Sequence, residues 1–355
     1  MRHESSRPQR ICEALLRHVR SCLASPGAIY PSIILVLVLV LLAAPLMAGA
    51  QPANSLVRIG FVPLGSPSNA FDQSLVEAFR QGLRETGLVE NQHVVVDLVW
   101  VANEAGYAPA VSELVERGAK VLVAAGSSAA TAAKRHTSTI PIVFVPAGNP
   151  VGIGLVDSLS HPGHNITGFS DVLADLSGKY VDLARDLGRS RERIDYVWYS
   201  GWPDGQHRLE ATERAALSLG VKLRARSIGG NAEIDDVMVA LKKAGAVTLV
   251  VQPSPFTYRH RVRLIESARA QGLGTIVAWP QAASDGALVA YGPAYPDMFR
   301  RAASYVARII RGAKPADLPV QEPTTFELVV NMKSAKILGL TLPQALLNRA
   351  DALIQ

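Results

Sequence analysis

The stretch VLVAAGSSAATAAKRHTSTIPIVFV, residues 121–145, decides the fold class. A valine-rich apolar run ends at Gly126, two serines follow, an alanine-rich helical segment comes next, and a second apolar run covers 140–145. Strands of buried parallel sheets are short continuous apolar runs, and helices connect them. The stretch therefore predicts a strand–helix–strand unit. Its Gly-Ser-Ser, at the start of the helix, could hold a phosphate or a carboxylate, contain a catalytic serine, or only cap the helix.

The same alternation of strand and helix runs along the chain on both sides of this unit. The first series ends in NITGF (165–169), which we interpret as a short extended crossing. Its expected strands are 56–64, 94–101, 120–126 and 140–146, and its other expected helices are 71–87 and 107–118.

A second series then begins and repeats the pattern. It ends in a second extended crossing, 286–292, and a long helix, 295–312. Its expected helices are about 173–187, 208–220, 234–245 and 258–272, and its expected strands are 193–200, 221–228, 246–253 and 274–280.

Two successive series predict an α/β fold with two doubly wound parallel-sheet lobes joined by a multi-strand hinge. The first lobe is expected to comprise 51–168 plus about 290–315. The second is expected to comprise 169–289 plus about 316–355. In open α/β sheets ligands bind beyond the carboxyl ends of the strands, so two facing lobes predict a cleft that closes on a small molecule.

The first fifty residues have the composition of a secretory signal. Five arginines precede the apolar run 33–44, and the segment ends in Ala48-Gly49-Ala50. We expect residues 1–50 to be a signal peptide, cleaved after Ala50, and the remainder to be periplasmic. An uncleaved membrane anchor is the alternative, because uncharged residues run from 33 to 50.

Charge and cysteine content change when this segment is set aside. The chain has 36 Lys and Arg against 30 Asp and Glu, a net charge of +6, and the five arginines and two acids of 1–50 contribute +3 of it. The remaining +3 does not point to nucleic acid. Both cysteines, Cys12 and Cys22, lie in the same segment, so we expect no disulfide or thiol chemistry after export.

The motifs of enzymes are incomplete. Gly126-Ser127-Ser128 begins like a nucleophile elbow, but Ala130 stands where the final glycine is required. No lysine is placed as in a phosphate loop, and the glycines at 148–154 do not have dinucleotide-binding spacing. We therefore expect no enzyme activity, no cofactor and no metal. A serine hydrolase stays an alternative that would need a reactive Ser128.

A carboxylate suits Gly-Ser-Ser better. The first N–H groups of a helix have no partner within it, and they lie beside the hydroxyls of Ser127 and Ser128. Other polar and aromatic residues follow the expected strands, where they could bind the remainder of a ligand. Aromatic rings can stack on a ligand ring, and Asp204 or Asp285 can pair with an ammonium group. These further candidate ligand-binding residues are Ser66, Ser68, Asn69, Asn149, Tyr199, Trp202, Asp204, Phe256, Trp279 and Asp285.

Several stretches are similar to one known family. They are RIGFVPLGSPS (58–68), AFRQGLRETGLVENQHV (78–94), VLVAAGSSAATAAK (121–134), TIPIVFV (139–145) with NPVGIGLVDSLSHPGHNITG (149–168), and GAKPADLPVQEPTTFELVVNMKSAKILGLTLPQALLNRADALI (312–354). The chain resembles the tryptophan/tyrosine-type substrate-binding proteins of ABC transporters from about Val57 to Ile354. It departs from the usual pattern at His164, at SGWPDGQ (200–206) and at Asp285-Gly286.

The resemblance implies a type 1 periplasmic binding protein fold and a small ligand, such as an amino acid or an aromatic carboxylate. It also implies an ABC permease as partner, a monomeric state and capture by closure of the cleft. A periplasmic ligand-sensing module for a signalling receptor is the alternative that the same residues allow.

Overall fold

The computed structural model describes residues 56–187, 192–202 and 204–355. The predicted signal segment and both cysteines lie outside these ranges. Within them, no helix is both long enough and apolar enough to cross a membrane.

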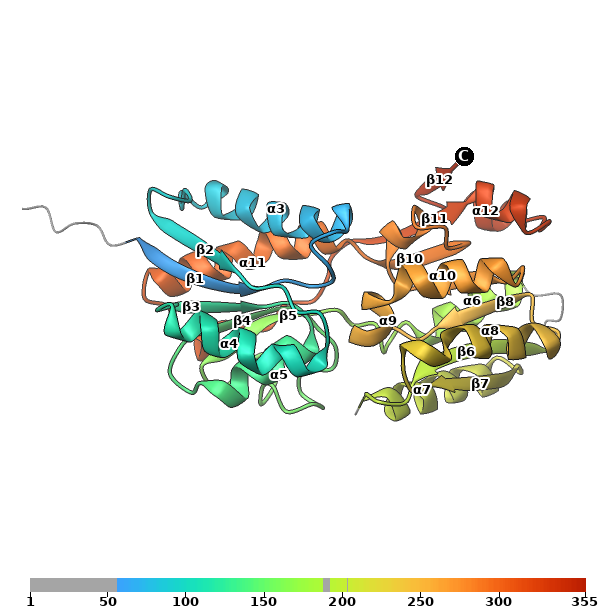
Figure 1. Cartoon of the computed structure of the whole chain (residues 1–355), viewed down its shortest axis with the longest axis horizontal. Coiled ribbons are helices and arrows are strands. Elements are labelled where there is room, and N and C mark those ends of the chain that lie inside the picture. The colour runs from blue at the N-terminus through green and yellow to red at the C-terminus, as the bar shows by residue number, and fades with distance from the viewer. Residues whose placement is uncertain (1–55, 188–191, 203) are drawn as a thin grey trace, which may run out of the picture. The chain divides into compact units, whose positions relative to one another are not determined.

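The first lobe is built on a five-stranded parallel sheet with the order β2-β1-β3-β4-β5. Helices α4 and α5 cover one face, and α3 packs with the late helix α11 over the other (Figure 1). The strands are β1 (Val57–Val62), β2 (Val94–Leu98), β3 (Val121–Ala124), β4 (Ile142–Ala147) and β5 (Ile166–Ser170), and the helices are α3 (Ala70–Glu85), α4 (Tyr107–Glu116), α5 (Ser127–His136) and α11 (Tyr295–Ile310).

The second lobe is built on a seven-stranded sheet with the order β12-β11-β10-β9-β8-β6-β7. Its strands are β6 (Arg193–Tyr199), β7 (Lys222–Ile228), β8 (Thr248–Val251), β9 (Gly274–Val277), β10 (Val289–Pro293), β11 (Phe326–Asn331) and β12 (Ala352–Ile354). Its helices are α6 (Ser177–Leu187), α7 (Gly205–Ser218), α8 (Ile234–Lys243), α9 (Pro255–Arg259), α10 (Arg261–Ala270), α12 (Met332–Ile337) and α13 (Gln344–Leu347).

The predicted α/β class with two mainly parallel lobes is confirmed, with local differences. β10 and β11 pair antiparallel, because β11 returns beside β10 from the C-terminal segment. The single helix expected at 258–272 is two helices that meet at His260. Pro255 and a capping box between Ser254 and Thr257 start the first of them earlier than expected. Both expected crossings overlap strands of the sheets: 165–169 overlaps β5 at the edge of the first sheet, and 286–292 overlaps β10 of the second sheet. The chain crosses between the lobes only after these strands, because each of them pairs with a neighbouring strand.

Three segments of chain connect the lobes, after β5, after β10 and before β11. Gln321 pairs with Phe169 beside β5: its N–H donates to Gly168 O at 3.0 Å, and the N–H of Ser170 donates to Gln321 O at 2.8 Å. The N–H of Ala294 donates to Thr325 O at 3.1 Å. These backbone bonds make the crossing segments a multi-strand hinge, as predicted.

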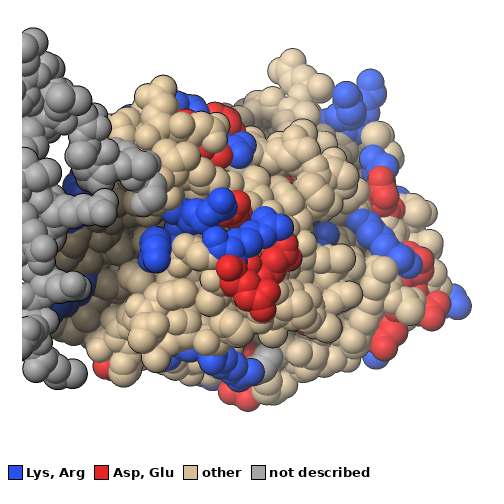
Figure 2. All heavy atoms as spheres, turned by 60° about the vertical axis from the view of Figure 1, so that its left-hand side comes forward, with Lys and Arg blue, Asp and Glu red and all other residues tan. Residues whose placement is uncertain are grey.

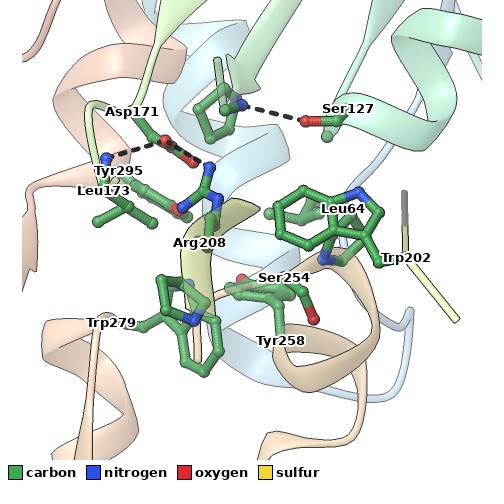
Figure 3. Close-up of a pocket in the computed structure, with 15 residues that line it drawn as sticks. Leu64, Ser127, Asp171, Leu173, Trp202, Arg208, Ser254, Tyr258, Trp279 and Tyr295 are labelled. Atoms are coloured by element: carbon green, nitrogen blue, oxygen red, sulfur yellow. Dashed lines mark hydrogen bonds and ion pairs between the residues drawn. The ribbon is translucent and has the colours of Figure 1, made fainter. Parts of the chain in front are cut away.

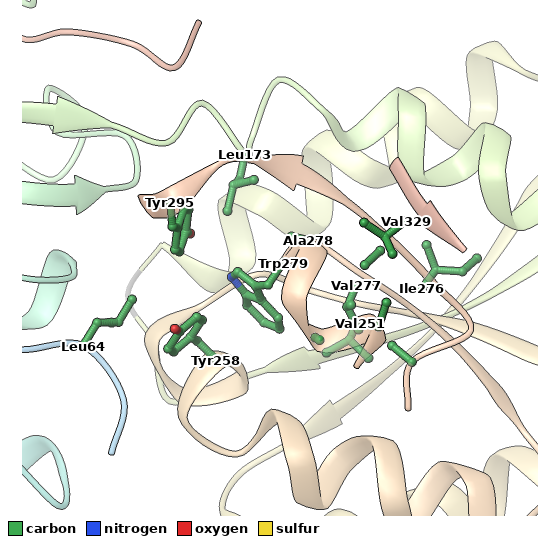
Figure 4. Close-up of a cluster of buried hydrophobic side chains, with 14 of the residues drawn as sticks. Leu64, Leu173, Val251, Tyr258, Ile276, Val277, Ala278, Trp279, Tyr295 and Val329 are labelled. Carbon is green, nitrogen blue, oxygen red and sulfur yellow. The ribbon is translucent and has the colours of Figure 1, made fainter. Parts of the chain in front are cut away.

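One apolar cluster contains buried residues of both lobes, and Figure 4 shows its part around the carboxyl end of the second sheet. Trp279 is 1% exposed, and its ring meets that of Tyr258 edge-on at 5.3 Å between centroids. Tyr295 lies 6.1 Å from Tyr258. Trp279 follows β9, Tyr258 lies within α9 and Tyr295 begins α11, so the three rings form an apolar floor at the carboxyl end of the second sheet.

Charges of both signs are interleaved on the surface. In Figure 2 basic and acidic side chains lie next to each other over the visible face. Exposed ion pairs of the described residues include Arg84–Glu77 at 2.8 Å and Arg300–Glu85 at 3.2 Å. Such pairs contribute little to stability, because water screens them.

Candidate functional site

A cavity of about 40 Å³ lies where residues following the strands of both sheets converge (Figure 3). The first lobe contributes the ends of β1, β3 and β4, and the hinge contributes Asp171 and Leu173. The second lobe contributes Arg208 and Ser254, and the apolar floor closes the remaining side. The lining residues are Leu64, Gly126, Ser127, Pro146, Gly148, Asp171, Leu173, Trp202, Arg208, Pro253, Ser254, Pro255, Tyr258, Trp279 and Tyr295.

A wider groove of about 1020 Å³ lies outside this cavity. Ser127 and Trp202 line both spaces, so the groove and the cavity adjoin at these two residues. Asn149 Nδ2 of the first lobe donates to Asp204 Oδ1 of the second at 3.4 Å. The groove is lined by Glu104, Tyr107, Ala108, Ser127, Ser128, Thr131, Ala132, Arg135, His136, Asn149, Val151, Gly152, Ile153, Trp202, Asp204 and His207.

In the described structure, helix α5 begins without a hydrogen bond from a capping side chain. Gly126 is the N-cap residue, with φ of +93°, a conformation that glycine adopts at low cost. Ser127 Oγ instead accepts a hydrogen bond from the N–H of Gly148, which follows β4, at 3.0 Å. Capping by a serine is therefore not what this structure shows. The positive end of the helix lies at the cavity wall, an environment that favours an anion.

Arg208 of α7 enters the cavity from the second lobe. Its side chain is 3% exposed, and its Nε donates to Asp204 Oδ2 at 2.9 Å. Its Nη2 lies 4.0 Å from Asp171 Oδ1, and its guanidinium lies 4.9 Å from the centre of the Trp202 ring. Nη1 is buried and has no hydrogen-bond partner among the described residues.

Asp171 follows β5 at the hinge and faces Arg208. Its Oδ1 accepts from the N–H of Leu173 at 3.2 Å. Burial raises the pKa of the Asp171 carboxyl, and the nearby Arg208 opposes that shift without cancelling it. Burial also acts to lower the pKa of Arg208, but Asp171 and Asp204 raise it overall, so the guanidinium is charged.

Six of the twelve predicted ligand residues line the cavity or the groove. Trp279 lines the cavity, and Ser127 and Trp202 line both spaces. The others line the groove: Ser128, Asn149 and Asp204.

The three predicted residues after β1 are engaged with one another and with α3. Ser66 Oγ and Ser68 Oγ lie 2.9 Å apart. Asn69 caps α3 by accepting from the N–H of Asp72 at 3.1 Å. None of the three lines either space.

The remaining predicted residues pack or pair away from both spaces. Tyr199 and Phe256 stack on each other, with centroids 4.1 Å apart and planes at 11°. Asp285 Oδ2 accepts from Arg261 Nε at 3.1 Å. Burial raises the pKa of Asp285, against the effect of Arg261. A role of any of these three residues in ligand binding stays a prediction.

Sequence reasoning missed Arg208, Asp171 and Gly148. Arg208 follows Asp204 by four residues at the start of a helix, which is a visible signal for an ion pair. Such pairs are usually exposed, and nothing in the local sequence distinguishes this one. Gly148 leaves room for the guanidinium of Arg208, because a Cβ at position 148 would lie 2.0 Å from Arg208 Nη2.

A second buried ion pair crosses between the lobes beside the cavity. Asp72 of α3 is 1% exposed and accepts from Arg261 Nη2 at 3.0 Å and from the Tyr258 hydroxyl at 2.7 Å. Its Oδ2 accepts from the N–H of Ser66 at 2.8 Å. Burial, with Asp72 adding to it, raises the pKa of Tyr258 well above its usual value, so the phenol stays a donor.

Arg259 makes a further contact between the lobes. Its guanidinium donates to Val101 O and to the Tyr107 hydroxyl, the latter at 2.5 Å. Together with Asp72, Tyr258 and Arg261, these contacts hold the lobes together around the cavity. Two α/β lobes joined by three crossing segments, with a small cavity lined from both lobes, define the type 1 periplasmic binding protein fold.

Comparison with known proteins identifies the family. The family described as "ABC transporter substrate binding protein" matches residues 68–354, and the chain belongs to it, as the resemblance predicted. Among the curated proteins, the chain is similar to the "Tyrosine-binding protein" of Clostridioides difficile (strain R20291). The two are 21% identical over 266 residues, which cover 74% of this chain and 76% of that protein.

Two solved structures have the same fold. One is the ABC domain of Streptococcus pneumonia in complex with L-Trp, 22% identical, with a TM-score of 0.76, covering 84% of this chain and 100% of the other. The other is a conserved domain protein of Vibrio cholerae O1 biovar El Tor, 25% identical, with a TM-score of 0.75 and the same coverage.

Proposed function

We propose that the protein is the solute-binding component of an ABC importer, which captures an amino-acid-like ligand between its lobes and delivers it to the permease. The observation that carries the proposal is the shared cavity. The helix N-terminus of one lobe and a buried arginine of the other line the same small space. A ligand that bears a carboxylate can bridge the lobes there. One relative is named a tyrosine-binding protein and another was solved with L-Trp, so an aromatic amino acid is the favoured ligand.

The carboxylate would bind at the start of α5, to the hydroxyls and N–H groups of Ser127 and Ser128. Trp202 and Trp279 would contact the ligand side chain from the second lobe. Asn149 and Asp204 join across the groove at 3.4 Å, so they would close over the ligand.

Capture requires the lobes to separate first. A buried water needs roughly 10–15 Å³ of such cavity volume, so a cavity of about 40 Å³ is too small for tyrosine or tryptophan. The groove adjoining Ser127 and Trp202 is the natural entrance. We infer that the contacts of Asp72 and Arg259 break on opening and form again on closure, as in hinged binding proteins.

The cellular setting follows from the same proposal. The protein would be exported with the help of residues 1–50, act as a monomer in the periplasm, and leave its ligand chemically unchanged. Uptake of a labelled amino acid by cells that lack the gene, compared with complemented cells, tests delivery to a permease. Equal uptake by both would contradict it.

Binding is tested by a thermal-shift screen of the purified protein against amino acids, aromatic acids and purines, followed by calorimetry. We expect L-tyrosine or L-tryptophan to raise the melting temperature. A Ser127→Ala, Ser128→Ala double variant should bind at least tenfold more weakly, because two hydroxyl contacts are lost. Full affinity in that variant would remove the serines from the site. Failure to bind any solute with a carboxylate would end the amino-acid proposal.

A further inference from the structure

We propose that Arg208 and Asp171 together recognise the charged groups of an α-amino acid, with Arg208 Nη1 binding the carboxylate and Asp171 the ammonium group. This inference rests on the proposed function and makes it more specific. A site with both residues prefers a ligand that carries a carboxylate and an ammonium group, whereas the serines at the start of α5 require only an anion.

The strongest observation is the unpartnered nitrogen. Arg208 is 3% exposed, and its Nη1 has no hydrogen-bond partner in the described part of the chain. Leaving a buried donor of a charged group unsatisfied is costly, and native proteins rarely do so without a reason. Because Arg208 lines the cavity, a ligand oxygen can satisfy Nη1.

The rest of the guanidinium is already oriented. Asp204 Oδ2 holds Nε at 2.9 Å, and the Trp202 ring lies 4.9 Å from the guanidinium carbon. Gly148 leaves room for Nη2, because a Cβ on that residue would lie 2.0 Å from it. A guanidinium fixed on one edge and free on the other is prepared to donate to a carboxylate.

Asp171 is placed to complete the recognition. Its Oδ1 is used by the N–H of Leu173, and it lies 4.0 Å from Arg208 Nη2, beyond hydrogen-bond distance. The two charged groups therefore face the cavity as a loose pair. An α-amino acid carries its carboxylate and its ammonium group on the same carbon, and this short separation suits such a pair.

The first test uses the unaltered protein and needs no variant. Calorimetry compares L-tyrosine with L-tyrosinamide and tyramine, which lack the carboxylate, and with 3-(4-hydroxyphenyl)propionate, which lacks the ammonium group. The corresponding tryptophan series is run in parallel. We expect each analogue to bind on the order of 100-fold more weakly than its amino acid, because a buried charged partner is left unpaired.

The second test separates the two residues. Arg208→Gln should weaken the binding of L-tyrosine about 100-fold but leave the weak binding of tyramine nearly unchanged. Asp171→Asn should weaken the binding of L-tyrosine and leave the binding of 3-(4-hydroxyphenyl)propionate nearly unchanged. The affinity of Arg208→Lys for L-tyrosine should lie between those of the wild type and Arg208→Gln, because lysine keeps the positive charge but lacks the two-pronged guanidinium donor. Arg214→Gln is the matched control, because Arg214 is exposed on the same helix.

The outcomes distinguish this inference from the proposed function. If amino acids bind but the analogues bind equally well, or if Arg208→Gln weakens tyramine as much as L-tyrosine, the inference fails and the proposed function stands. If Arg208→Gln does not fold, the comparison of ligands in the unaltered protein decides. If no amino acid binds, both fail.

Discussion

Two arginines of the second lobe are almost equally buried, yet their surroundings differ. Arg261 is 2% exposed and Arg208 is 3% exposed, and each lies over an aromatic ring, Tyr258 at 4.5 Å and Trp202 at 4.9 Å. Arg261 donates to the carboxylates of Asp72 and Asp285 and to the backbone oxygen of Tyr258. Arg208, in contrast, has one nitrogen, Nη1, without a hydrogen-bond partner among the residues that the structure describes.

The difference separates a contact between the lobes from a contact kept for a ligand. A fully partnered ion pair between lobes favours the closed arrangement without any ligand. An incomplete one lowers the stability of that arrangement until a ligand supplies the missing acceptor. Under the proposed function, the two arginines therefore act differently when the lobes close. Arg261 joins the lobes directly, whereas Arg208 makes the closed arrangement depend on a bound ligand.

The largest expected effect is that of Asp72→Asn, which breaks the complete pair. The free energy of unfolding should fall by about 3 kcal/mol, because Arg261 keeps its burial but loses its main counter-charge. Urea denaturation measures the loss, and X-ray scattering reports whether the lobes open instead. Asp235→Asn is the control, since that carboxylate pairs with Arg263 on the surface. A loss below about 1 kcal/mol with unchanged scattering would contradict the role given to Asp72.

Tyr258→Phe should have the next largest effect. It removes one hydrogen bond to a charged acceptor, at 2.7 Å, and keeps the ring on Trp279, so unfolding should become easier by about 2 kcal/mol. The double variant with Asp72→Asn should cost less than the sum of the single variants, since both act on one contact. Strict additivity would show that the hydroxyl acts elsewhere.

Gly148→Ala tests the incomplete arginine. Its methyl group would displace Nη2, so ligand affinity should fall about tenfold, with a stability loss of about 1 kcal/mol from overpacking. Calorimetry and urea denaturation give the two quantities. Gly178→Ala is the matched control, because within the described ranges no heavy atom lies within 4 Å of a Cβ placed there. Unchanged affinity in Gly148→Ala would mean that the position of the guanidinium does not matter.

The smallest expected effect is the pH dependence of Asp171. Burial raises its pKa, so its contribution to stability is present at low pH and is lost as pH rises through the folded value. Asp171→Asn removes this titration, and the variant should gain stability relative to the wild type as pH rises from about 3.8. Urea denaturation between pH 4 and 8 measures the difference. The opposite trend would show that attraction to Arg208 outweighs burial.

Much of the fold was predictable from local pattern. The continuous apolar runs 121–125 and 140–145 contain most of the buried strands β3 and β4, and Gly-Ser-Ser lies at the start of α5 as expected. Ser127 and Trp202 line the cavity, and the sequence pointed to them because residues that follow parallel strands meet at one edge of a sheet; their contact with a ligand stays a prediction. The pairing of β11 with β10 was not predictable, because it joins segments that are far apart in sequence.

The sequence by itself determined the two α/β lobes, the family, and the place along each lobe where a ligand is expected, because these depend on periodicity and on strand ends. Only the tertiary structure decided which polar residues face the cavity. Asp285 and Asp171 are both acids near crossings, yet the first pairs with Arg261 and the second lines the cavity. The unpartnered nitrogen of Arg208 depends on contacts from both lobes and the hinge, and such contacts leave no periodic trace in the sequence.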